Sequence, residues 1–162
     1  MLKLLYFAFV YPHLLYAIEM YGNTNHCHLS KLEKLNKILR ILQNRSIRTN
    51  NIELYKYYDT LPLPLLHNYQ ILLFLQRFYH HSYTLPDVFV TYFTQISSIH
   101  NYNTRGKRNL YFTTTETETG KKALTHKGCI LWNKLPEGLK TIKSVAVFKH
   151  RIRDYLISNY IV

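Results

Sequence analysis

The sequence predicts a mainly α-helical protein, an irregular helical bundle with a small β-strand or hairpin excursion near residues 95–119. Apolar residues recur at helical spacing in residues 28–43, 65–81 and 144–156. Residues 95–119 lose this spacing and are rich in Thr, Ser and Asn. Hydrophobic residues make up 47% of the 162-residue chain, which is enough for a sizeable core and argues against disorder.

The N-terminal stretch, residues 2–20, is predicted to form a helix that Pro12 kinks or divides. Polar residues and Gly22 then favour a turn at 21–25, so a helical hairpin is expected. The charges in residues 2–20, including Lys3 and Glu19, argue against a membrane span. No cleavage pattern of a signal peptide follows this segment. We therefore expect a buried core helix and no membrane partner. One predicted apolar face consists of Leu2, Leu5, Tyr6 and Phe9.

Residues 28–43 have the clearest helical spacing in the chain, with leucines and isoleucines on one side. The expected role of the cations outside this apolar stripe is a solvated face, and phosphate binding is the alternative. These cations are Lys31, Lys34, Lys37, Arg40 and, just beyond the helix, Arg45 and Arg48.

A short helix is predicted after Asn50-Asn51, and the prolines at 62 and 64 end it. A second clear helix covers residues 65–81, followed by Leu85-Pro86 and one or two further helical turns. Leu110-Tyr111-Phe112-Thr113 is a β-prone run inside the polar excursion.

Residues 121–135 return to helical character, with or without an interruption at Gly128. They carry the only tryptophan, Trp132, which can bury a large area and needs a partner for its indole N–H. We expect Trp132 to anchor two helices and Pro136 to end its own helix. Ser144 then caps a last amphipathic helix.

The chain is strongly basic, with 21 Lys and Arg against 9 Asp and Glu, a formal charge of +12 and a pI near 9.7. This balance favours a polyanionic partner, nucleic acid first and an anionic membrane second. The alternatives are a surface that only keeps the protein soluble and a genome with biased composition.

No motif points to catalysis by this chain alone. Cys27 and Cys129 form no CxxC pair, which favours a reducing compartment, the nucleus or cytoplasm, and no zinc knuckle. Asp59, in Tyr57-Tyr58-Asp59-Thr60, has no second carboxylate nearby in sequence for two-metal chemistry. No phosphate-binding glycine loop is present, so neither a cofactor nor a small-molecule substrate is expected. The histidines at 26, 28, 80 and 81 are expected to be surface imidazoles, and Cys27 a small buried thiol, rather than metal ligands.

Lys and Arg side chains that neutralise phosphates, with tyrosines stacking on bases, are the expected binding chemistry. In residues 100–105 we favour a structural clasp, with Tyr102 buried, over direct binding by Asn101, Tyr102 and Asn103. The structural anchors are then Trp132, Asn133, Pro136 and Tyr102. The candidate contacts to nucleic acid are Arg105, Lys107, Arg108, Lys121, Lys122, Lys127, Lys149, Arg151 and Arg153.

Several motifs, in this order, resemble the region after the polymerase domain of non-LTR (LINE-type, jockey-like) retrotransposon reverse transcriptases, RNA-directed DNA polymerases. The resemblance covers nearly the whole chain. The motifs are Tyr11-Pro12-His13-Leu14 with Tyr16-Ala17, Tyr21-Gly22-Asn23-Thr24, His100-Asn101-Tyr102-Asn103-Thr104-Arg105, Gly128 with Leu131-Trp132-Asn133-Lys134-Leu135-Pro136 and Leu139-Lys140, and Phe148-Lys149 with Tyr155-Leu156.

The resemblance implies a thumb-like helical portion in residues 1–93 and a downstream segment in residues 94–162, packed as one unit. It implies a non-catalytic C-terminal fragment of a transposable element's enzyme that helps hold RNA template or RNA–DNA hybrid beside a missing upstream polymerase domain. The family's catalytic aspartates and the Cys/His knuckle of some relatives have no matching positions, and Tyr21 replaces a common Trp, as in a truncated or decayed copy. The alternative function is a structural interaction module, a remnant or recruited domain, that docks through the apolar N-terminal helix.

Overall fold

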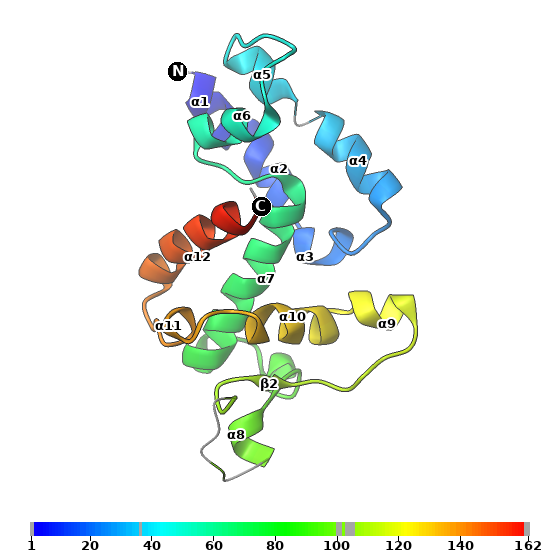
Figure 1. The fold of residues 1–162 in the computed structure, drawn as a ribbon, viewed down its shortest axis with the longest axis vertical. Helices are drawn as coiled ribbons and strands as arrows, with labels where there is room; N and C mark the ends of the chain where they lie inside the picture. The colour runs from blue at the N-terminus through cyan, green and yellow to red at the C-terminus, as the bar shows by residue number, and fades with distance from the viewer. Residues whose placement is uncertain (1, 36, 100–101, 103–105, 161–162) are drawn as a thin grey trace. The chain divides into compact units, whose positions relative to one another are not determined.

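The computed structural model describes residues 2–35, 37–99, 102 and 106–160. These residues form a mainly α-helical fold with a small two-stranded antiparallel sheet, which confirms the predicted fold class (Figure 1). The contacts within the chain define two compact units, Met1–His67 and Asn68–Val162, and each is described by itself. The expected division into residues 1–93 and 94–162 stays a prediction.

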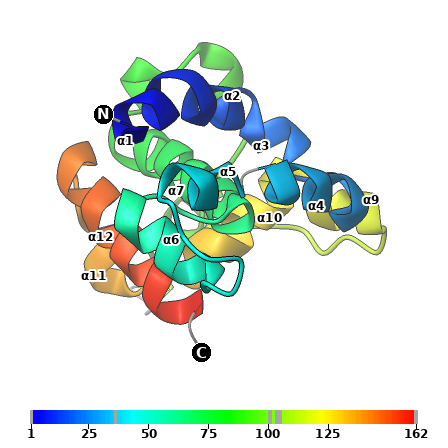
Figure 2. The same ribbon diagram turned by 90° about the horizontal axis from the view of Figure 1, so that it is seen from above.

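The first unit is built from short helices. The chain runs through α1 (Leu2–Leu5), the π-helical turn η1 (Tyr6–Val10), α2 (Tyr11–Leu15), α3 (Ile18–Tyr21), α4 (His26–Leu35), α5 (Ile38–Leu42), α6 (Asn51–Tyr58) and the start of α7 (Leu63–His80). Helices α5 and α6 lie side by side in both views (Figure 1 and Figure 2).

Pro12 divides the N-terminal helix, as the sequence predicts. Proline has no N–H to donate and fits the first turn of a helix, and Pro12 lies in the first turn of α2. The preceding residues widen into the π turn, in which the Tyr11 N–H bonds to the Tyr6 carbonyl. Ala17 then takes a left-handed conformation, φ 53°, and separates α2 from α3. Among the described residues, no helix is both long enough and apolar enough to cross a membrane.

The core of the first unit is a cluster around Tyr6, which is 1% exposed. Its ring lies 5.7 Å from that of Tyr58, between centroids. The predicted apolar face is only partly right, because Leu2, Leu5 and Phe9 are 46%, 42% and 69% exposed. That face assumed a regular α-helical period, and the π turn changes the angular spacing of residues 6–10. The buried members of the cluster are Tyr6, Leu39, Leu54 and Tyr58.

The helix predicted for residues 28–43 is two helices, α4 and α5. The Lys37 N–H donates to the Lys34 carbonyl at 3.2 Å, a three-residue spacing that interrupts the α-helical ladder. Leu39 on α5 joins the buried cluster, whereas Leu29 and Leu32 on α4 are half-buried. Packing around Tyr6 therefore includes α5 more fully than α4.

The second unit continues α7 from Asn68 and adds, in its described part, a short sheet, five further α-helices and two 3-10 helical turns. Strand β1 (Thr94–Gln95) pairs antiparallel with β2 (Leu110–Tyr111), with Thr94 opposite Tyr111 and Gln95 opposite Leu110. The remaining elements are η2 (Ser82–Thr84), η3 (Asp87–Phe89), α8 (Ile96–Ile99), α9 (Glu118–Lys122), α10 (Leu124–Asn133), α11 (Glu137–Lys140) and α12 (Val145–Tyr160).

Helix α7 is the centre of the second unit. Gly128 of α10 faces it, and a Cβ there would lie 3.4 Å from Leu75 and 3.5 Å from Ile71. A Cβ at this position would make ordinary van der Waals contacts, and little room remains beyond it. Helix α10 continues through Gly128, and the break falls instead at Ala123, between α9 and α10. The inward residues of α12 are buried, as predicted: Phe148, Ile152 and Leu156.

Two aromatic truncations in η1 should have opposite consequences. Tyr6→Ala removes a buried ring and should lower the free energy of unfolding by about 3–5 kcal/mol. Phe9→Ala, three residues away and 69% exposed, is the matched control and should change it by less than about 0.5 kcal/mol. Urea unfolding of the full chain measures both, and equal losses would contradict the described orientation of the π turn.

Candidate nucleic-acid interface

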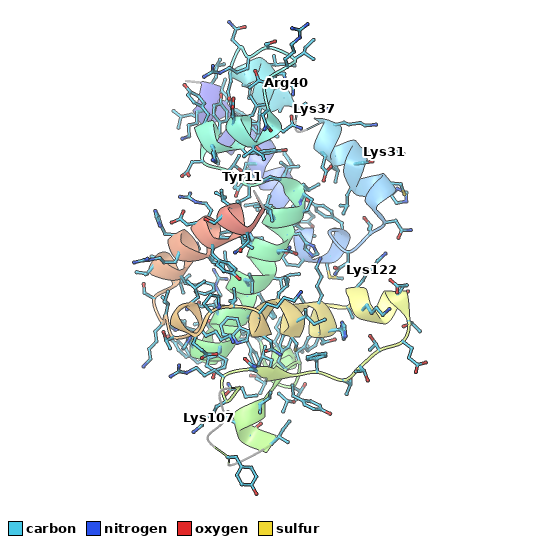
Figure 3. All side chains as sticks on the ribbon, viewed as in Figure 1. Tyr11, Lys31, Lys37, Arg40, Lys107 and Lys122 are labelled. Carbon is cyan, nitrogen blue, oxygen red and sulfur yellow. The ribbon has the colours of Figure 1, made fainter. Side chains whose placement is uncertain are left out.

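A basic turn, Gly106–Asn109, precedes β2 and is here called the anchored turn. The Asn109 N–H donates to the Gly106 carbonyl at 2.9 Å and closes it. Lys107 is exposed at its tip, and Figure 3 shows it on the loop before β2. The turn presents Lys107 and Arg108, two of the predicted contacts to nucleic acid.

Trp132 binds the backbone of the anchored turn through a hydrogen bond. It is 0% exposed, as the sequence predicts, and its ring stacks against Tyr79 with centroids 5.4 Å apart. Its indole Nε1 donates to the Arg108 carbonyl at 3.1 Å. The partner that a buried indole needs is therefore the main chain of the anchored turn.

Asn133 binds the backbone of Leu110, the first residue of β2, through both ends of its side-chain amide. Its Oδ1 accepts from the Leu110 N–H at 2.8 Å, and its Nδ2 donates to the Leu110 carbonyl at 2.9 Å. A side-chain amide thereby pairs with a backbone amide in the manner of a neighbouring strand. Because Leu110 is 1% exposed, the two bonds satisfy backbone groups that a buried residue would otherwise leave unpaired.

Lys140 completes the anchor with a buried ammonium group, its residue only 2% exposed. Nζ donates to Asn109 Oδ1 at 2.8 Å, Glu137 Oε1 at 3.0 Å and the Asn133 carbonyl at 3.3 Å. An ammonium group has three donors, and these contacts use all three. The charge of Lys140 is thus compensated by Glu137, whose other oxygen lies 3.6 Å from Arg108 Nη1.

The chain between α11 and α12 is held against α7 by polar side chains. Gln76, 0% exposed, donates from Nε2 to the carbonyls of Ile142 at 3.2 Å and Lys143 at 2.7 Å. His80 Nε2 lies 2.8 Å from the Lys140 carbonyl, and His81 Nε2 lies 2.7 Å from that of Lys143. A carbonyl oxygen only accepts, so both rings carry a proton on Nε2. His80 and His81 are half-buried structural donors rather than surface imidazoles, and Cys27 is exposed rather than buried. In the described part of the chain, no group of three or more His, Cys, Asp or Glu residues could hold a metal ion.

Burial shifts the pKa values of a thiol, a phenol and an ammonium group in the second unit. Burial raises the pKa of the Cys129 thiol to about 11, and its Sγ donates to the Tyr111 carbonyl at 3.5 Å. Burial also raises the pKa of Tyr79, which Arg108 lowers and Glu137 raises to lesser extents. On α10, burial lowers the pKa of Lys127 because desolvation disfavours the charged ammonium. Lys127 is therefore a poorer candidate for phosphate binding than Lys107.

The predicted cations do not form one patch. Helices α9 and α12 lie on opposite sides of the second unit in both views (Figure 1 and Figure 2), and Figure 3 shows Lys107 and Lys122 well apart. Lys121 is paired with Glu118 at 2.7 Å, an interaction that also lowers the pKa of Glu118. Lys122, Lys127 and Arg153 are half-buried, whereas Lys149 and Arg151 are exposed on α12.

Tyr102 corrects one expectation about the anchor. It is 78% exposed, so it is not the buried part of a clasp. Phe93 and Leu110, which precede and follow residues 100–105, are buried, at 5% and 1% exposed. Pro136 is an exposed N-cap of α11 and separates it from α10, as predicted. Arg105, Asn101 and Asn103 lie outside the described residues.

Sequence reasoning missed Lys140 and Asn109 as members of the anchor, whereas it correctly placed Gln76 on the buried face of the helix at 65–81. Glu137 stands three residues before Lys140, which predicts an ordinary pair on a helix surface. Nothing in the local sequence marks Lys140 as buried, because its partner Asn109 lies 31 residues away. The apolar surroundings of Gln76 were the only signal that it is internal.

Comparisons with protein-family models, with curated proteins and with solved structures find no match for this chain.

Replacing Asn133 should test the anchor. Asn133→Ala leaves the Leu110 N–H and carbonyl without their partner, and each unpaired group should cost about 1–3 kcal/mol of unfolding free energy. Asn159→Ala is the control, because Asn159 makes one exposed bond to the Tyr155 carbonyl. It should cost less than about 0.5 kcal/mol. Thermal or urea unfolding gives both values, and a loss no larger for Asn133 than for Asn159 would refute the anchoring role.

Proposed function

We propose that this chain is a non-catalytic nucleic-acid-binding part of a LINE-type reverse transcriptase, the region that follows the polymerase domain. The observation that carries the proposal is the anchored turn, in which Trp132, Asn133 and Lys140 fix the backbone of an exposed basic loop. Its ligand would be RNA or RNA–DNA hybrid. The chain's formal charge of +12 supports a polyanionic partner.

The physical advantage of the anchored turn is pre-organisation. A lysine on a fixed backbone loses less conformational freedom on binding than one on an unrestrained loop. Lys107 also has no carboxylate within ion-pair distance in the described part of the chain. Two tyrosines of the same segment, Tyr102 and Tyr111, are 78% and 51% exposed and can stack on bases. The exposure of Tyr102 thus supports binding where a clasp was expected.

The proposal assigns catalysis to an upstream polymerase domain, which would be the protein partner, in the nucleus or cytoplasm. Asp59 fits this assignment: it is the left-handed C-cap of α6, with φ 61° and ψ 41°. A helix end of this kind is a structural role for the aspartate in the Tyr-Tyr-Asp-Thr sequence.

Lys107→Gln should weaken binding in a salt-dependent way. Titration of single-stranded RNA and of RNA–DNA hybrid into the full chain should give a logarithmic salt slope that falls by about 1 in the variant. Lys134→Gln, which removes an exposed lysine outside the predicted set, is the control and should leave the slope nearly unchanged. Wild-type binding without salt dependence would exclude the proposal.

A second candidate function is a structural interaction module, and the exposed residues of the N-terminal helix favour it. Leu4 and Phe9 are 73% and 69% exposed, and Leu2 and Leu5 are each above 40%. Several large apolar side chains exposed close together often mark a protein interface. The partner would be the polymerase domain or a second copy of this chain.

Charged substitutions separate this candidate from the first. If the surface docks to a second copy, the full chain should self-associate with increasing concentration, and Leu5→Glu with Phe9→Glu should abolish this. Ile47→Glu, at an 85% exposed position of the same unit, serves as the control. Sedimentation velocity measures the outcome, and a monomer at every concentration would count against self-docking.

A further inference from the structure

A hollow in the first unit lies beside the loop that joins α5 to α6, residues 43–50. Its volume is about 370 Å³, within the range of small-ligand sites. The lining residues that matter for its chemistry are Arg45, Thr49, Glu53, Lys56 and Tyr57. All of them belong to the loop or to α6, so the hollow lies within one unit.

The walls of this hollow are held by hydrogen bonds at both ends of the loop. Arg40 Nη2 donates to Asn51 Oδ1 at 3.0 Å and to the Thr49 carbonyl at 3.4 Å. Gln43 Nε2 donates to the Leu54 carbonyl at 2.8 Å. The Asn50 side chain caps α6 by accepting from the Ile52 N–H at 3.0 Å. The loop is thus fixed to α6, and the hollow is formed before a ligand enters.

The chemistry of the hollow combines an aromatic face with cations. The Arg45 guanidinium lies over the Tyr57 ring, with its carbon 5.9 Å from the ring centroid. Tyr57 also stacks with Tyr58 at 5.8 Å, yet it remains 63% exposed. Bases stack on both tyrosine rings and guanidinium planes. Arg45 and Tyr57 therefore form a stacked pair, which a base can extend on the outer face of the guanidinium.

The charges of the hollow favour an anion. Arg45 and Lys56 line it against one acid, Glu53. Among the described residues, neither cation lies within ion-pair distance of a carboxylate. A purely apolar ligand would gain nothing from these cations, and a bare phosphate would gain nothing from the aromatic ring. The cations and the aromatic ring together fit a ligand that has both a base and a phosphate.

We propose that this hollow is a second binding site, which takes a nucleoside phosphate unit. The base stacks with Tyr57 and Arg45, and the phosphate pairs with Lys56 and the guanidinium edge of Arg45. This chemistry is shared by a free nucleotide and by one unit of single-stranded RNA. Binding of single-stranded RNA rests on the proposed function, whereas binding of a free nucleotide does not.

The site also divides the basic residues of the first unit into two groups. Figure 3 shows Lys31 and Lys37 along α4 and the start of α5, and both are exposed. They keep the role of a solvated face. Arg40 fixes the loop, and Arg45 is the member of this set that lines the hollow, so it takes up the phosphate-binding alternative that the sequence left open.

The test uses the full chain and two ligands, uridine monophosphate and a single-stranded oligouridylate, with inorganic polyphosphate as a polyanion without bases. Tyr57→Leu should weaken oligouridylate binding by about tenfold, because stacking on one aromatic residue contributes this much or more. Tyr57→Phe should retain most of the affinity. Polyphosphate binding should be unchanged by Tyr57→Leu and weakened by Arg45→Gln. The control is Tyr16→Leu, at an 81% exposed position of the same unit, and circular dichroism checks that each variant is folded.

The outcomes separate this site from the proposed function. The inference is overturned if Tyr57→Leu and Arg45→Gln bind both nucleotide ligands as tightly as Tyr16→Leu does. If Lys107→Gln alone weakens RNA binding, the anchored turn is the interface and the hollow is not. If uridine monophosphate binds through Tyr57 while RNA does not bind at all, the hollow is a nucleotide site and the proposed function fails. Binding of oligouridylate alone, lost in Tyr57→Leu, supports the RNA source.

Discussion

The pairing of the Asn133 amide with the backbone of Leu110 is the constraint on which the second unit depends. The sheet beside it has only two residues in each strand, too few to be stable alone. Asn133 supplies a further pair of strand-like bonds from the last residue of α10, so a helix end stabilises the sheet. Trp132 and Lys140 bind the two residues before Leu110, at the Arg108 carbonyl and the Asn109 side chain. Residues 132–140 thereby fix the turn that leads into β2.

The sequence predicts best those elements whose pattern is local. The inward face of α12, the division at Pro12 and the burial of Trp132 follow from apolar spacing, proline chemistry and side-chain size. The orientation of the N-terminal side chains does not follow from the sequence pattern, because a π turn changes the helical period and no distinctive residue type marks it. The burial of Lys140 depends on a partner 31 residues away, Asn109. The exposure of Tyr102 depends on which side chains occupy the interior of the unit. Such features become visible only when the packing is known.

The two candidate binding regions differ in how they achieve their shape. The anchored turn is fixed through side chains that come from a distant part of the sequence, whereas the hollow is fixed by bonds within about ten residues. Helices α9 and α12, which carry several of the candidate cations, lie on opposite sides of the second unit. Under the proposed function, a long polyanion would reach such separated positions more readily than a compact ligand would.

The bonds between the anchor and residues 108–110 close a loop of more than twenty residues without a covalent link. The part between them, residues 112–117, is mostly exposed. Loop-closure entropy grows slowly with length, by about 0.6 kcal/mol for each doubling. Insertions there should consequently be tolerated without loss of the fold. The position is also a suitable one for attaching a fluorescent or affinity tag.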